Sequence, residues 1–110
     1  MPPDSLAQFE LLVVLAALQL GPDEAYTVSV ADIIEEKTGR SVRRANVHTT
    51  LRRLEEKGLI STRLGDPRPE RGGKARRLVE VLPEGIRAAQ AATGAIEALS
   101  AGLGDALGAG

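Results

Sequence analysis

The hydrophobic positions of the chain gather in a few segments, whose spacing and end signals predict helices first and strands later. Residues 6–20 are apolar nearly all round and stop at Gly21, which favours a helix that lies in the centre of the core or also meets a second chain. Residues 28–38 carry apolar positions flanked by acids and stop at Gly39. They predict a short second helix.

Residues 42–57 are predicted to form a third helix, capped by Ser41 and ended by Gly58. Its apolar positions recur at helical spacing and define one narrow buried stripe, made of Val47, Leu51 and Leu54. The side chains that point away from this stripe are small, polar or basic, namely Ala45, Thr49, Arg52 and Arg53. Asn46 and His48 lie on its flanks. The helix thus has an apolar inner face and a basic, hydrogen-bonding outer face.

Two strand-like runs follow at 59–64 and 75–82, and the connection between them is rich in Gly, Pro and Arg. This arrangement predicts a β-hairpin with a basic tip. Pro83 opens a last helix, because proline is well tolerated in a first helical turn. The seam of this helix follows alternating three- and four-residue steps, at Ile86, Ala89, Thr93, Ile96, Ser100, Leu103 and Leu107. Several glycines weaken it, so it must pack on another element, such as the first helix of its own or of a second chain.

This order of elements predicts an α+β fold that is mostly α. It is a winged helix-turn-helix with three helices, a β-hairpin wing and a C-terminal helix. We place the winged-helix domain at 1–82 and the C-terminal helix, a candidate for dimerisation, at 83–110, whose end is expected to fray. The length of 110 residues suits one such core.

Composition excludes several kinds of site. The chain has no cysteine and one histidine, His48, so zinc–thiolate, iron–sulfur and cysteine-nucleophile chemistry are excluded, and we expect no metal and no cofactor. No apolar run is long enough for a membrane span, and no basic leader precedes the first one. A soluble, cytoplasmic chain without a membrane partner is therefore expected. No set of nucleophile, base and orienting residue is present, which argues against an enzyme.

The formal net charge of −1 hides a strong separation of charge along the chain. Residues 40–77 hold 12 of the 14 Lys and Arg residues but only 4 of the 15 Asp and Glu residues, a local balance of +8. A basic middle third of this kind is either a solvated charged surface or the docking site of a polyanion. Charge alone leaves both interpretations open.

The chemistry of the third helix favours double-stranded DNA as that polyanion. A major groove admits one helix, whose N-terminal residues meet the base edges, and Arg43, Arg44 and Asn46 lie at this end. Arginine can bind guanine, and asparagine adenine, through two hydrogen bonds. A hairpin rich in Arg and Gly can follow the sugar–phosphate backbone or enter the minor groove.

Seven segments match a known family: 9–15, 20–21, 25–28, 33–41, 47–60, 70–77 and 82–85. Among them, the run VHTTLRRLEEKGLI joined to the run ERGGKARR is far more specific than either run alone. On these segments the chain resembles the PadR-like family of winged helix-turn-helix transcriptional regulators, in particular its short members. The resemblance spans about residues 6–87. One departure is His48, which stands where the family usually has tyrosine.

The resemblance implies a homodimer that binds a pseudo-palindromic operator and usually represses transcription. Some members release DNA when a small molecule binds, so a small-molecule effector is a further candidate partner. The predicted DNA-binding residues are Ser41, Arg43, Arg44, Asn46, His48, Thr49, Arg53, Arg71, Gly72, Gly73, Lys74 and Arg76. The predicted dimer interface consists of Leu6, Phe9, Val13, Ile86, Ala89, Thr93, Ile96, Leu99 and Leu103.

Simpler interpretations stand beside these assignments. Arg52 and Arg53 could pair with the nearby Glu55 and Glu56 as surface salt bridges. His48 could be an ordinary surface histidine. The alternative function is a winged-helix protein-interaction module whose basic surface binds an acidic partner protein. Small polar residues beside arginines suit base edges better than protein hot spots, which favour large aromatic side chains.

Overall fold

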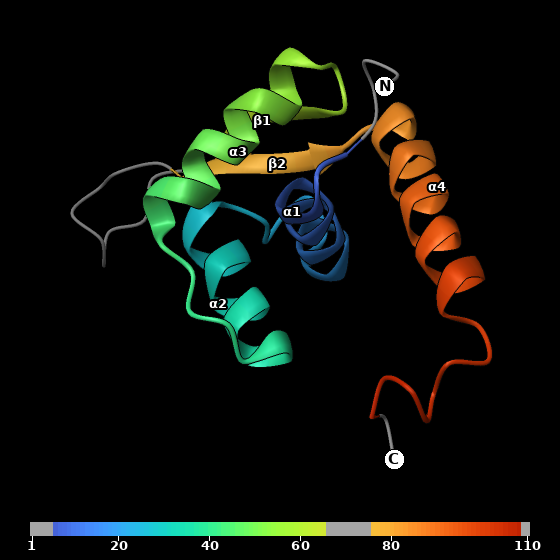
Figure 1. Ribbon diagram of the computed structural model, residues 1–110. Coiled ribbons are helices and arrows are strands. Elements are labelled where there is room, and N and C mark those ends of the chain that lie inside the picture. The colour runs from blue at the N-terminus through green and yellow to red at the C-terminus, as the bar shows by residue number, and fades with distance from the viewer. Residues whose placement is uncertain (1–5, 66–75, 109–110) are drawn as a thin grey trace.

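The computed structural model describes residues 6–65 and 76–108. The elements are α1 (Gln8–Leu20), α2 (Thr27–Thr38), α3 (Arg44–Glu56), β1 (Ile60–Leu64), β2 (Arg77–Val81) and α4 (Pro83–Ser100). The two strands pair antiparallel in one sheet (Figure 1). This order confirms the predicted fold class, a mostly helical winged helix-turn-helix.

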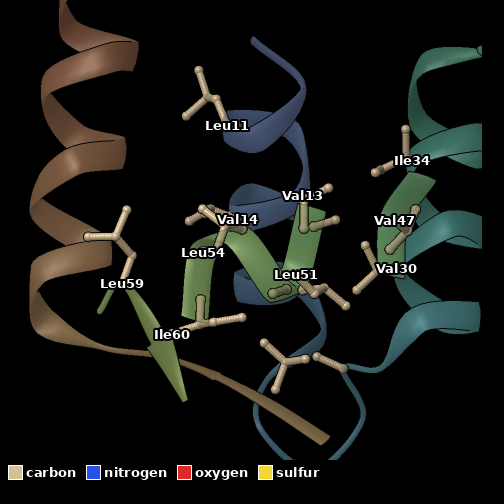
Figure 2. Packing of buried hydrophobic residues seen from close by; sticks show 14 of the residues in the cluster. Leu11, Val13, Val14, Val30, Ile34, Val47, Leu51, Leu54, Leu59 and Ile60 are labelled. Carbon is tan, nitrogen blue, oxygen red and sulfur yellow. The ribbon is translucent and has the colours of Figure 1, made fainter. Parts of the chain in front are cut away.

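α1 occupies the centre of the fold. It contacts α2, α3, β2 and α4, and Figure 1 shows it between α4 on one side and α2 and α3 on the other. Its buried residues are Glu10, Leu11, Val13, Val14, Ala16 and Ala17. Apolar side chains from α2, α3 and β1 meet those of α1 in one cluster (Figure 2). The nearly all-round apolar pattern of this segment therefore reflects a core helix.

The turn between α2 and α3 decides where the third helix begins. The backbone N–H of Val42 donates to Oε2 of Glu35 on α2 at 2.7 Å. This bond holds Val42 in the turn, before the first helical residue. α3 begins at Arg44 with Arg43 as its N-cap, so the predicted start at Val42 is wrong. Ser41 is likewise not the N-cap, contrary to the prediction.

The hairpin is fixed to the helices at several points. Gly58 lies between α3 and β1, where the sequence predicted the end of the helix. Its φ of +76° is a backbone conformation that favours glycine. In the sheet, Thr62 lies opposite Val79. The N–H of Val79 also donates to the carbonyl oxygen of Ala25 at 2.8 Å, so the connection between α1 and α2 borders the sheet. This bond fixes the hairpin to the segment that joins α1 to α2, and β1 also contacts α3.

α4 packs closely only over its first turns. It begins at Pro83, as predicted, and a Cβ at Gly85 would overlap the carbonyl oxygen of Leu59 and lie 2.9 Å from Cγ1 of Val81. Ala89 is buried as well. The helix ends at Ser100, earlier than the predicted seam. The large apolar residues exposed on α4 and beyond it are Ile86, Ile96, Leu99, Leu103 and Leu107.

Candidate nucleic-acid interface

α3 presents a polar and basic face outward. Val47, Leu51 and Leu54 are buried, as the sequence predicted, and Thr50 is buried beside them. The rest of the helix is exposed and includes the predicted contacts Arg44, Asn46, His48, Thr49 and Arg53. No large apolar side chain of α3 is exposed. The exposed face therefore offers hydrogen bonds and positive charge.

In the described part of the chain, the arginines of this face form no salt bridge with an acidic side chain. Across residues 6–65 and 76–108, no ion pair or side-chain hydrogen bond is formed by Arg44, Arg52 or Arg53. The suggested salt bridges of Arg52 and Arg53 with Glu55 and Glu56 are thus not formed. Arg43 at the N-cap is also exposed and unpaired in the described part of the chain. Four guanidinium groups remain available to an outside anion.

On the side toward α1, two hollows border α3. One of about 260 Å³ is lined by Phe9, Leu12, Arg40, Ser41, Val42, Arg43 and Asn46. The other, of about 340 Å³, is lined by Phe9, Asn46, Thr49, Thr50 and Arg53. Phe9, predicted for the dimer interface, therefore lies beside predicted DNA-binding residues. The structure brings together Ser41, Arg43, Asn46, Thr49 and Arg53 along this edge.

On the side toward the hairpin, a hollow of about 130 Å³ lies between α3 and the strands. Its lining residues are Thr27, His48, Leu51, Arg52, Glu55, Thr62, Arg77 and Val79. Nη1 of Arg77 donates to Oγ1 of Thr62 at 2.9 Å. The Thr62 hydroxyl donates in turn to Oε2 of Glu55 at 2.8 Å. This chain of hydrogen bonds joins β2, β1 and α3.

The predicted wing contacts divide into two groups. Arg71, Gly72, Gly73 and Lys74 lie outside the described residues. Arg76 is half-buried, and its guanidinium lies over the Tyr26 ring at 4.8 Å from the centroid. This cation–π contact gives Arg76 an internal partner and places it where the hairpin meets the start of α2.

Sequence reasoning missed a buried ion pair beneath α3. Nζ of Lys57 lies 2.8 Å from Oε1 of Glu10, whose side chain is 8% exposed. Oε1 of Glu10 also accepts the backbone N–H of Ala7 at 2.9 Å. Burial by itself raises the pKa of Glu10, but the hydrogen bonds from Lys57 and Ala7, with the charges of Lys57 and Arg53, outweigh burial and hold the pKa below its ordinary value.

The predicted dimer residues differ strongly in exposure. Ile86, Ile96, Leu99 and Leu103 are exposed, and Leu6, Phe9 and Thr93 are half-buried. Val13 and Ala89 are buried within the single chain, at 0% and 3% exposure. The central position of α1 and the docking of α4 cover these two side chains within one chain, and their interface role stays a prediction.

Two kinds of feature are absent from the described residues. Within 6–65 and 76–108, no cluster of three or more His, Asp or Glu side chains could hold a metal ion. None of the helices described is long and apolar enough to cross a membrane.

Comparison with known proteins places the fold. No protein-family model matches the chain, and no curated protein matches it. It is similar to a solved PadR family transcriptional regulator from Eggerthella lenta, with a TM-score of 0.67 and 25% identity over 87% of this chain and 80% of that chain. A transcriptional regulator from Clostridium thermocellum has a TM-score of 0.65 and 17% identity, covering 83% and 84% of the two chains. A protein from Thermoplasma acidophilum has a TM-score of 0.70 and 13% identity, covering 89% and 91%.

These similarities support a DNA-binding regulator. Transcriptional regulators are not enzymes, which agrees with the interpretation of the chain as non-enzymatic. The structural similarities also support the resemblance to the PadR-like family that the sequence of the third helix and the hairpin indicated. The chain therefore has a winged helix-turn-helix fold that is similar to that of a PadR family transcriptional regulator.

Proposed function

We propose that the chain is a sequence-specific DNA-binding transcriptional regulator that acts as a dimeric repressor. The observation that carries this proposal is the outer face of α3, where Arg44, Arg52 and Arg53 are exposed and form no salt bridge with any residue that the structure describes. An unpaired guanidinium on a rigid helix matches guanine edges and phosphates through two hydrogen bonds.

The proposal places α3 in the major groove of B-DNA. Its N-terminal end carries Arg43, Arg44 and Asn46, which we assign to base edges. Ser41, His48, Thr49 and Arg53 are assigned to supporting contacts along the same face. The 65–75 wing follows the backbone or the adjacent minor groove, with Arg71, Gly72, Gly73 and Lys74 at the contact and Arg76 at its base.

The proposal assigns dimerisation to α4 together with α1. Leu99 is 83% exposed and Ile96 is 56% exposed, which is unfavourable for apolar side chains of an isolated chain. A second copy that covers them through the same surface forms a two-fold dimer. Such a dimer presents two α3 helices to an inverted repeat, which supports a pseudo-palindromic operator. The other residues assigned to this interface are Leu6, Phe9, Ile86, Thr93 and Leu103.

A salt series with duplex DNA tests the binding. The logarithm of the affinity for DNA falls linearly with the logarithm of the salt concentration, and the slope is proportional to the number of phosphates that the protein neutralises. We expect a steep, linear decrease of log affinity with log salt concentration, measured by fluorescence anisotropy. Affinity that does not depend on salt would contradict the proposal, and capture of an acidic protein without DNA binding would favour an interaction module. A small-molecule effector is sought by repeating the titration with candidate compounds.

A further inference from the structure

We propose that the hollow between α3 and the hairpin binds one phosphate of the DNA backbone, held by Arg52 and Arg77. This inference rests on the proposed DNA-binding function and adds two residues, Arg52 and Arg77, that are not in the predicted set of DNA-binding residues. The hollow has a volume of about 130 Å³ and is lined by α3 on one side and by both strands on the other. It also receives His48 and the hydroxyl of Thr62.

The geometry of a duplex explains why a phosphate passes here. In B-DNA one sugar–phosphate strand separates the major groove from the neighbouring minor groove. If α3 occupies the major groove and the wing reaches the next minor groove, that strand lies between them. The hollow lies at this position, because Arg52 belongs to α3 and Arg77 begins β2. A phosphate at this point meets guanidinium groups from both sides.

The hydrogen bonds around the hollow orient Arg77 for this role. One nitrogen of Arg77 donates to Thr62, whose hydroxyl donates to Glu55. A guanidinium has five N–H donors, so the others remain for a phosphate. Among the described residues that line the hollow, Glu55 is the only acid, and one of its oxygens accepts the hydrogen bond of Thr62. Arg52 and Arg77 together outweigh this single negative charge, so the hollow attracts an anion.

The test compares the salt slope of the double variant Arg52→Gln/Arg77→Gln, in which neither guanidinium can hold the phosphate, with that of the unmodified chain on one duplex. Loss of one phosphate contact lowers the slope by about 0.9, so the affinity of the unmodified chain falls about 3.5-fold more than that of the double variant between about 50 and about 200 mM salt. Arg77→Lys keeps the charge and is expected to keep the slope. Arg87→Gln is the matched control, because Arg87 is exposed on α4 and pairs with Glu84.

The outcomes separate this inference from the function on which it rests. A steep slope for the unmodified chain, unchanged in Arg87→Gln and shallower in the double variant Arg52→Gln/Arg77→Gln, supports the phosphate site. An equally steep slope in all variants overturns the site and leaves the DNA-binding function standing. A flat slope for the unmodified chain contradicts the function itself. Thermal unfolding of each variant establishes that it is folded, and the change at Arg52 removes no hydrogen bond or ion pair with a described residue.

Discussion

Glu10 and Lys57 form an ion pair of 2.8 Å that joins the first turn of α1 to the C-terminal end of α3. The carboxylate is 92% removed from solvent by the fold, since its side chain is 8% exposed. The carboxylate also accepts the backbone N–H of Ala7, so it satisfies a donor at the N-terminal end of α1 as well. The core helix and the proposed DNA-reading helix are therefore held together by charge as well as by apolar contact.

Glu10→Gln is expected to destabilise the fold by about 1–3 kcal/mol at neutral pH, because Lys57 loses a charged acceptor whose side chain is 8% exposed. The folded chain holds the pKa of Glu10 below its ordinary value of 4.5, so the stabilisation is full above that pH and is lost as the pH falls through the lowered value. The difference in unfolding free energy between the unmodified chain and the variant should therefore shrink on acidification. Urea unfolding at several pH values measures it.

The control for this variant is Glu84→Gln, which removes the exposed partner of Arg87. Because surface pairs of this kind contribute at most about 1 kcal/mol, this change should be small and nearly independent of pH. Equal effects of both variants would contradict a special role for the buried pair.

Gly85→Ala should weaken the docking of α4. A Cβ at this position overlaps the carbonyl oxygen of Leu59, so α4 must move away from Leu59, at a cost of about 1–3 kcal/mol. Gly94→Ala is the matched control on the same helix, because nothing lies within 4 Å of its Cβ. There the higher helix propensity of alanine should stabilise the chain by up to about 1 kcal/mol. Thermal unfolding of the two variants should show shifts of opposite sign.

Leu99→Glu should prevent dimerisation without unfolding the single chain. Leu99 is 83% exposed, so a carboxylate is solvated in the monomer but is buried if a second copy covers α4. Ala98→Glu, also at an exposed position of α4, is the control for added charge. Light scattering coupled to size-exclusion chromatography should give the mass of a monomer for Leu99→Glu. A dimer of unchanged stability would show that this surface is not the interface.

Asn46→Ala should relax sequence preference rather than abolish binding. If Asn46 reads an adenine edge, its loss costs about 1–3 kcal/mol on the preferred sequence and little on others. The comparison of affinities for a preferred and a scrambled duplex measures this ratio. A uniform loss on both duplexes would assign Asn46 to the backbone instead.

The sequence predicted most of the fold because its signals are local. The stripe of Val47, Leu51 and Leu54 and the left-handed residues Gly39 and Gly58 were identified from spacing and residue type, and the structure confirms them. Each such signal depends on neighbours a few residues away.

The features that were missed depend on contacts between distant segments. The start of α3 is set by the bond from Val42 to Glu35 on another helix, which no local pattern reveals. Glu10 and Lys57 are separated by 47 positions. The one available signal was an acid within an otherwise apolar helix, which indicates a buried partner. Arg52 and Arg77 line the same hollow because the hairpin lies beside α3, and the local sequence pattern does not predict this arrangement.

The most direct test of a sequence-specific regulator is selection from random duplex DNA by the purified chain, followed by sequencing of the bound pool. The account predicts an enriched inverted repeat whose half-sites are centred about one helical turn apart, one for each α3 of a dimer. Binding that resists added salt, or a bound pool in which no sequence is enriched, would contradict it.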